Sequence, residues 1–225
     1  MQKEIIESLQ RAHWRDGAAF LDEEEFRGSI TAQVVAVEPF DEILVNWNGR
    51  TPGDSTIKIE VQLLIEDQWT DFYPIAVWSE NHGGTSLGHE DQWARTEVDL
   101  VKVKDNRRAT GYRWRVQLRR TEFDSGVCLQ DIFVSTRDRE RFVMVMSQEI
   151  AATTLDVPCR SQMIQHKSYA NLICSPTCLG MVAKYHGIDI ATQKMIWKAY
   201  DRNSGIFGNW LLNAAVLGSL GFEVK

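Results

Sequence analysis

The sequence predicts a multi-domain protein of β plus α+β class: an N-terminal antiparallel β-sandwich, jelly-roll-like in its succession of short strands, followed by a helical region. Apolar residues recur with a period of two between residues 29 and 136, and the pattern becomes helical from Leu155 onward. The 225 residues also exceed the length of most single domains. We therefore divide the chain into residues 1–28 (a helix and lead-in), 29–150 (the sandwich and a connector) and 151–225 (the helical domain).

The N-terminal segment predicts a short amphipathic helix over residues 3–13, because Ile5, Ile6 and Leu9 fall on one side of such a helix. Residues 1–14 are charged and lack the apolar core of a secretory leader. The chain contains no run of 18 apolar residues, so the sequence predicts no membrane span. We therefore expect a cytoplasmic protein.

The strands are clearest where apolar residues alternate with polar ones. Such runs cover residues 57–65 and 112–118, and a shorter one covers 43–47. Further strands are expected at 31–38, 72–79, 96–103 and 128–135. Turn-forming residues separate the strands at 46–55, 80–91 and 104–111. Short alternating strands in such succession predict a sandwich that buries one face of each sheet.

Three helices are expected after the connector, at residues 175–186, 190–201 and 209–220. Pro176 suits the first turn of a helix, where its missing N–H would be unpaired anyway. Gly187 suits the position just after a helix end, where glycine adopts a left-handed conformation freely.

Cys174 lies at the start of the first helix. Free backbone N–H groups at a helix start stabilise a thiolate and can bind an oxyanion, so Cys174 is a candidate nucleophile, although such cysteines are more often structural. Gln162, twelve residues earlier, is a candidate second donor to that oxyanion, and Gln165 competes with it. Cys178 shares an apolar stripe with Leu179, Met181, Val182 and Tyr185, and we expect it to be a buried core residue.

The run VPCRSQ…CSPTCLGMVAKYHG…GNWLLNAAVLGSLG resembles papain-like cysteine peptidases of the bacteriocin-processing (double-glycine leader) type, and more closely their stand-alone bacterial relatives. The resemblance covers residues 155–225 and implies that Cys174 is the nucleophile and Gln162 the oxyanion glutamine. Further matches are Pro176, Met181, Val182, Tyr185, Gly187, Gly208, Asn209 and Trp210. Ser175 departs from the usual glycine and Cys178 from the usual serine. The β region looks like the all-β domain found ahead of some stand-alone relatives.

A thiolate nucleophile needs a histidine to shuttle its proton. His186 follows Cys174 by twelve residues, about 18 Å along one helix, and His166 lies in the loop that carries Gln162. The resemblance implies that the base histidine and its Asp or Asn partner lie on strands downstream of the three helices. We therefore expect residues 151–225 to be the N-terminal helical part of a papain-like domain, and this chain to be an inactive fragment.

Two other functions compete with the peptidase. One is a non-catalytic binding or scaffold protein whose sandwich recognises a glycan or a protein. The other, a redox pair of Cys174 and Cys178, is disfavoured because their spacing is CxxxC rather than CxxC.

The charge and the cysteine and histidine content limit the classes of partner and cofactor that we expect. A net charge of −6 and scattered basic residues argue against nucleic acid. The cysteines and histidines form no spaced cluster typical of zinc, so we expect no metal and no cofactor. The expected partner is a peptide or protein substrate. Broad apolar faces on the helices at 175–186 and 209–220 also predict self-association or cover by a missing C-terminal segment.

Overall fold

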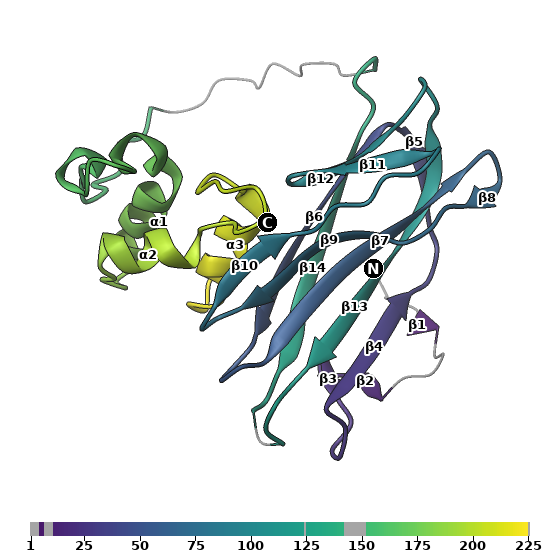
Figure 1. Ribbon diagram of the computed structural model, residues 1–225, viewed down its shortest axis with the longest axis horizontal. Coiled ribbons are helices and arrows are strands. Elements are labelled where there is room, and N and C mark those ends of the chain that lie inside the picture. Colours follow the sequence, from purple (N-terminus) through teal and green to yellow (C-terminus); the bar gives the residue numbers. More distant parts are fainter. Residues whose placement is uncertain (1–4, 7–10, 124, 142–151, 225) are drawn as a thin grey trace.

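The computed structural model describes residues 5–6, 11–123, 125–141 and 152–224 of the protein, which form two antiparallel sheets and a helical part (Figure 1). One sheet has the order β1-β4-β13-β7-β9-β10, with β5 also paired to β13 and β8 to β7. Its strands are β1 (Ile5–Ile6), β4 (Arg27–Ala32), β5 (Val35–Phe40), β7 (Thr56–Ile65), β8 (Gln68–Trp69), β9 (Tyr73–Ser79), β10 (Gly83–Ser86) and β13 (Ala109–Arg119).

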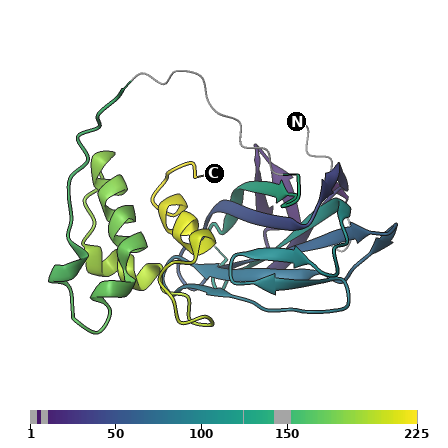
Figure 2. The ribbon, with the colours of Figure 1, turned by 90° about the horizontal axis from the view of Figure 1, so that it is seen from above.

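The second sheet has the order β11-β12-β6-β14-β3-β2. Its strands are β2 (Ala12–Arg15), β3 (Ala18–Leu21), β6 (Glu42–Arg50), β11 (Ala94–Glu97), β12 (Leu100–Val103) and β14 (Cys128–Arg137). Figure 2 shows the two sheets as stacked layers with the helices at one end. The β-rich antiparallel architecture predicted from the alternating pattern is therefore confirmed.

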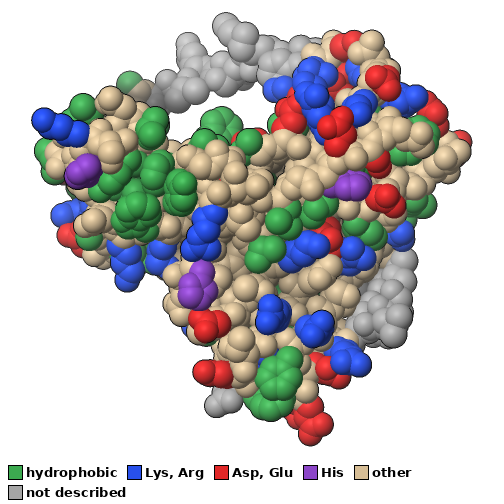
Figure 3. Space-filling model, viewed as in Figure 1, with side chains coloured by type: hydrophobic (Ala, Val, Ile, Leu, Met, Phe, Trp, Pro, Cys, Tyr) green, Lys and Arg blue, Asp and Glu red, His purple; other side chains and the backbone are tan. Residues whose placement is uncertain are grey.

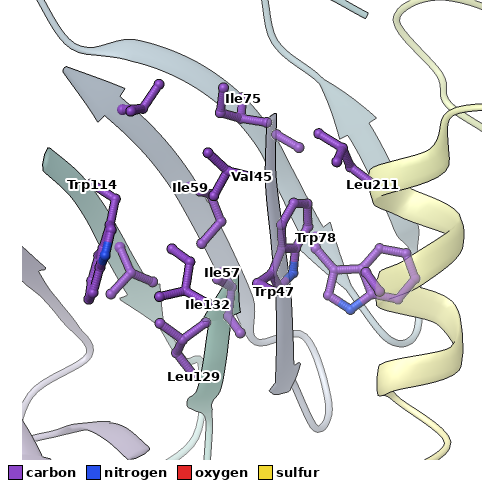
Figure 4. Packing of buried hydrophobic residues seen from close by; sticks show 14 of the residues in the cluster. Val45, Trp47, Ile57, Ile59, Ile75, Trp78, Trp114, Leu129, Ile132 and Leu211 are labelled. Carbon is purple, nitrogen blue, oxygen red and sulfur yellow. The ribbon is translucent and has the colours of Figure 1, made fainter. Parts of the chain in front are cut away.

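The main hydrophobic core fills the space between the sheets. Alternate residues of β7, such as Ile57 and Ile59, point toward Val45 and Trp47 of β6, and all four are fully buried. Trp78 of β9 extends the same cluster toward the helical part (Figure 4). Each fully buried side chain of this size contributes about 1.5–3 kcal/mol relative to an exposed one. The period-two pattern thus fixes which face of each strand is buried.

The expected helix over residues 3–13 is wrong in the part that the structure describes. Ile5–Ile6 is a strand paired with Thr31 and Ala32 of β4, and Ala12–Arg15 forms a hairpin with β3. Asp16 and Gly17 make the two-residue turn of this hairpin, with φ angles of 50° and 84°. An Asp-Gly pair adopts these positive angles readily, which favours the hairpin over a helix. The rest of the expected helix, residues 7–10 included, lies outside the described residues.

Strand β10 lies inside a segment that the sequence predicts as a turn, residues 80–91. Gly84 in this strand faces the helical part, and a Cβ placed on it would lie 2.3 Å from the Cδ2 of Leu212. The close approach requires glycine, so a residue typical of turns here serves packing inside a sheet.

All three expected helices are present, as α1 (Cys174–Tyr185), α2 (Thr192–Lys198) and α3 (Trp210–Gly218). Two short 3₁₀ helices precede them, η1 (Gln162–Ile164) and η2 (Ala170–Leu172). Helix α3 lies nearest the sheets (Figure 2), and every one of its residues from Leu211 to Gly218 is buried. The apolar face of α3 is therefore covered by the sandwich of the same chain. None of the helices in the described part of the chain is long and apolar enough to cross a membrane.

A buried carboxylate ties the helical part to the sandwich. Asp201, fully buried between α2 and α3, accepts hydrogen bonds from the Ser86 backbone N (2.9 Å), the Ser204 hydroxyl (2.6 Å) and the Asn209 side-chain amide (2.9 Å). Asn209 also caps α3 by accepting from the Leu211 N at 3.1 Å. Burial raises the pKa of Asp201, but these hydrogen bonds outweigh it and hold the pKa below the ordinary value.

Candidate active site

Cys174 is the first residue of α1, and its thiol is exposed to solvent. The preceding residue, Ile173, provides no side-chain cap for the helix, and Pro176 in the first turn has no N–H. The backbone N–H groups of Cys174 and Ser175 therefore meet no capping side chain within the described residues. A helix start of this kind presents hydrogen-bond donors to an anion beside the sulfur.

Gln162 begins η1, and its side chain is half-buried. Its Nε2 donates to the carbonyl oxygen of Ala170 at 2.8 Å, and Ala170 begins η2, the turn that leads into Cys174. A glutamine amide has two N–H groups, so this bond leaves one for another acceptor. This hydrogen bond links the Gln162 side chain to the segment that leads into α1.

Ser175, which replaces the usual glycine of the resembled family, is held by α3. The Nδ2 of Asn213 donates to its hydroxyl oxygen at 2.5 Å and to the carbonyl of Phe207 at 3.3 Å. Asn213 is only 4% exposed. The Ser175 hydroxyl is therefore engaged with the neighbouring helix.

The expectation that Cys178 is a core residue is wrong, because the structure exposes its side chain. The buried face of α1 is made by Pro176, Thr177, Gly180 and Ala183, three of which are small. Small residues let α1 approach its neighbours closely, whereas the larger apolar residues Val182 and Tyr185 remain 41% exposed. Cys174 and Cys178 are four residues apart and lie on one accessible side of the helix.

Arg160 is a site residue that the sequence did not single out. Its guanidinium donates to the carbonyl of Ile190 and, at 2.7 Å, to the carboxylate of Asp189, in the connection between α1 and α2. It lies against Gly180 of α1, where an added Cβ would be 2.8 Å from its Nη1. Hydrogen bonding by Lys184, joined by the charge of Arg160, lowers the pKa of Asp189. Arg160 thereby fastens the segment that carries Gln162 to the helix that carries Cys174.

Four of the five histidines contact groups away from Cys174, and the fifth, His89, packs against Tyr73 of the sandwich. His13 pairs with Asp22, His82 with Asp54 and His166 with the Ser168 hydroxyl. His186 follows the far end of α1 and packs edge-on against Phe222. Within the described residues no hydrogen bond joins an imidazole to Cys174.

The surface around the helical part is rich in apolar side chains. Figure 3 shows hydrophobic side chains gathered over it at the left of the view. The exposed large apolar residues of this part include Leu172, Val182, Trp197 and Trp210.

Among the described residues one group has ligand atoms close enough to share a metal ion. It consists of Asp71, His89 and Asp91, and it lies on the sandwich rather than beside Cys174.

Two protein-family models match the chain. The model described as Peptidase C39 N-terminal domain matches residues 11–129, more than half of the chain and almost all of the two sheets. The chain belongs to the peptidase C39 family. The model described as Peptidase C39 like family matches residues 154–225, the segment with Gln162, Cys174 and the three helices. The resemblance to cysteine peptidases is thus confirmed at the level of the C39 family. No curated protein and no solved structure matches the chain.

The boundary between the two family matches agrees with the architecture of this peptidase C39-like protein. The first match ends at residue 129, inside the last strand of the sandwich, and the second begins at 154, shortly before η1. Asn209 and Trp210 of the Gly-Asn-Trp element start α3, with Asn209 as the cap and Trp210 68% exposed. The Nδ2 of Asn209 also donates to the carbonyl oxygen of Val98 in the sandwich at 3.3 Å, so Asn209 of this element links the helical part to the sandwich.

Proposed function

We propose that this peptidase C39-like protein acts on peptide bonds through the Cys174 sulfur, with Gln162 and the start of α1 as the oxyanion site of a papain-like domain. The observation that carries the proposal is the placement of an exposed thiol at an uncapped helix start, preceded by a turn to which the Gln162 amide is bonded. The jelly-roll-like sandwich serves as the platform that holds α3, and α3 in turn holds Ser175 through Asn213.

The chemistry follows from these groups. The Cys174 thiolate attacks the carbonyl carbon of the substrate, so that an S–C bond forms and the carbonyl oxygen becomes an oxyanion. The Cys174 N–H and the remaining Gln162 N–H donate to that oxygen. Collapse of the tetrahedral intermediate expels the amine, which needs a proton, and water then cleaves the thioester.

The proton for the leaving amine comes from a general acid, ordinarily a histidine. Because no described histidine is hydrogen-bonded to Cys174, we propose that residues 1–225 can form the thioester with an activated ester but do not turn over peptides alone. The alternative function, a binding sandwich with a degenerate peptidase remnant, predicts no preferential acylation of Cys174.

The proposal is tested with p-nitrophenyl acetate, whose leaving group departs as an anion and needs no general acid. We expect one acetyl group per chain on Cys174, located by peptide mass spectrometry. Gln162→Ala should slow this acylation about 100-fold, because removal of one oxyanion donor has effects of this size. Gln165→Ala, which alters the competing glutamine, should leave the rate unchanged.

Modification spread equally over Cys174, Cys178 and Cys159 would support the binding function, since all three thiols are exposed. Equal slowing by Gln162→Ala and Gln165→Ala would show that Gln162 is not the specific donor to the oxyanion. In a longer form of the protein that carries the base, Cys174→Ala should abolish peptide hydrolysis and Cys178→Ser should retain it.

A further inference from the structure

Three side chains with metal-binding atoms meet on the sandwich, away from the thiol site. Asp71 lies between β8 and β9, and His89 and Asp91 lie between β10 and β11. One ligand atom from each residue lies within 4.8 Å of the others. Two atoms bound to one ion at 2.0–2.2 Å are separated by roughly 3–4.4 Å, so atoms within 4.8 Å of one another need only a small adjustment to share an ion.

The imidazole of His89 contains a buried nitrogen that lacks a partner. Its Nε2 has less than 1 Å² of exposed surface and no hydrogen-bond partner among the described residues. A buried polar atom left unpaired costs about 1–3 kcal/mol, and an ion or water is a common reason for such an atom in a folded protein. The ring is held beside Tyr73, with centroids 5.4 Å apart.

The two oxygens of the Asp91 carboxylate differ in how many hydrogen bonds they accept. Its Oδ1 accepts from the backbone N of Trp93 (2.7 Å) and of Ala94 (3.0 Å) and from the Tyr73 hydroxyl (2.7 Å). Among the described residues, its Oδ2 accepts a hydrogen bond only from the same Tyr73 hydroxyl, at 2.8 Å. Donors of this kind orient a metal-binding carboxylate and leave its other oxygen for the ion.

The neighbouring charges are compatible with a cation. Lys104 donates to the Glu90 carboxylate (2.7 Å) and to the Asp91 carbonyl oxygen (2.9 Å). Its charge is therefore paired with Glu90, and the two carboxylates of Asp71 and Asp91 remain for a divalent ion to neutralise.

We propose that Asp71, His89 and Asp91 bind one divalent transition-metal ion that fastens the β8–β9 turn to the loop between β10 and β11. One imidazole nitrogen and two carboxylate oxygens suit ions such as Zn²⁺ or Co²⁺, whereas Ca²⁺ prefers six to eight oxygen ligands. Water completes the coordination, because Asp71 is exposed. The metal stabilises the sandwich and does not take part in chemistry at Cys174.

The test titrates Co²⁺ and Zn²⁺ into the metal-free protein after its thiols have been blocked with iodoacetamide. We expect one ion per chain by calorimetry, a weak visible Co²⁺ absorption without sulfur-to-metal bands, and a rise in Tm. His89→Ala and Asp71→Asn should each weaken binding at least about tenfold. His82→Ala is the matched control, because His82 is exposed and pairs with Asp54 outside the group.

Asp71→Asn keeps the shape of an exposed side chain, so it tests the site even if His89→Ala perturbs folding. The proposal is overturned if the thiol-blocked protein binds neither ion, or if Asp71→Asn binds them as tightly as the unchanged protein. Equal weakening by His82→Ala would also overturn it, since the ions would then bind surface histidines in general.

Discussion

The carboxylate of Asp201 provides the sharpest test of how the two parts of the molecule are joined. Replacing it by alanine removes the acceptor for Ser86, Ser204 and Asn209 without adding bulk. The Ser86 N–H and the Asn209 amide are buried, with the residues 2% and 1% exposed, so neither donor can turn to water. The Ser204 hydroxyl is half-buried and can find solvent.

The expected loss follows from those two stranded donors. Each buried donor left unpaired costs about 1–3 kcal/mol, so the two together predict that Asp201→Ala destabilises the packing of the helical part by about 2–6 kcal/mol. A loss of 3 kcal/mol corresponds to a more than hundredfold larger population of the opened state. Amide hydrogen exchange in α3 should therefore accelerate by that factor, while exchange in β7 should change much less.

The assay combines urea unfolding with hydrogen exchange followed by mass spectrometry. Asp189→Ala is the control, because this carboxylate also pairs with cations but is 65% exposed, and surface ion pairs contribute at most about 1 kcal/mol. If Asp201→Ala and Asp189→Ala both lower the free energy of unfolding by the same small amount, the idea that a buried carboxylate joins the helical part to the sandwich is refuted.

The pH dependence has a definite sign. The pKa of Asp201 is lower in the folded chain than its ordinary value, so the folded state stabilises the ionised carboxylate relative to the protonated one. The stabilisation is complete above the ordinary aspartate pKa and is lost as pH falls through the lower folded value. The stability difference between the unchanged protein and Asp201→Ala should thus be constant near pH 7 and shrink below about pH 4.

Two further substitutions test the packing around the site. Gly84→Ala should destabilise the protein by about 1–3 kcal/mol in urea, because its Cβ would lie 2.3 Å from Leu212; Gly88→Ala, with nothing within 4 Å, should not. Arg160→Ala should lower stability by about 1–2 kcal/mol and slow acylation of Cys174, because the segment with Gln162 loses its bonds to Asp189 and Ile190. Unchanged acylation would show that Arg160 does not position Gln162.

Much of the fold could be predicted because it depends on local patterns. Alternation over residues 57–65 follows from a strand with one face in the core, and structure places β7 at Thr56–Ile65. The helix starts at Cys174 and Trp210 follow from proline and asparagine at positions that suit helix termini. The expected N-terminal helix is wrong because the Asp16–Gly17 turn, with its positive φ angles, favours a hairpin over the helix that the apolar spacing indicates.

The remaining features depend on contacts between distant segments. The apolar stripe around Cys178 predicts that this residue is buried, yet α1 buries its small residues instead. How closely those small residues pack depends on the segments that lie against α1, and the sequence pattern of α1 does not contain that information. Asp201 and Ser86 are 115 residues apart in sequence and meet through the packing of α2 and α3 on β10. The placement of Cys174 at an exposed helix start was predictable, whereas the pairing of Gln162 with Ala170 was not.

The central claim is that the start of α1 makes Cys174 unlike any other thiol in the chain. Cys178 is the natural reference, since it is also exposed and lies four residues further along the same helix. The most direct measurement is the rate of iodoacetamide alkylation at each cysteine at pH 7, followed by peptide mass spectrometry. We expect Cys174 to react at least about tenfold faster than Cys178, and the difference to disappear in urea. Equal rates in the folded protein, or faster reaction at Cys178, would contradict this claim.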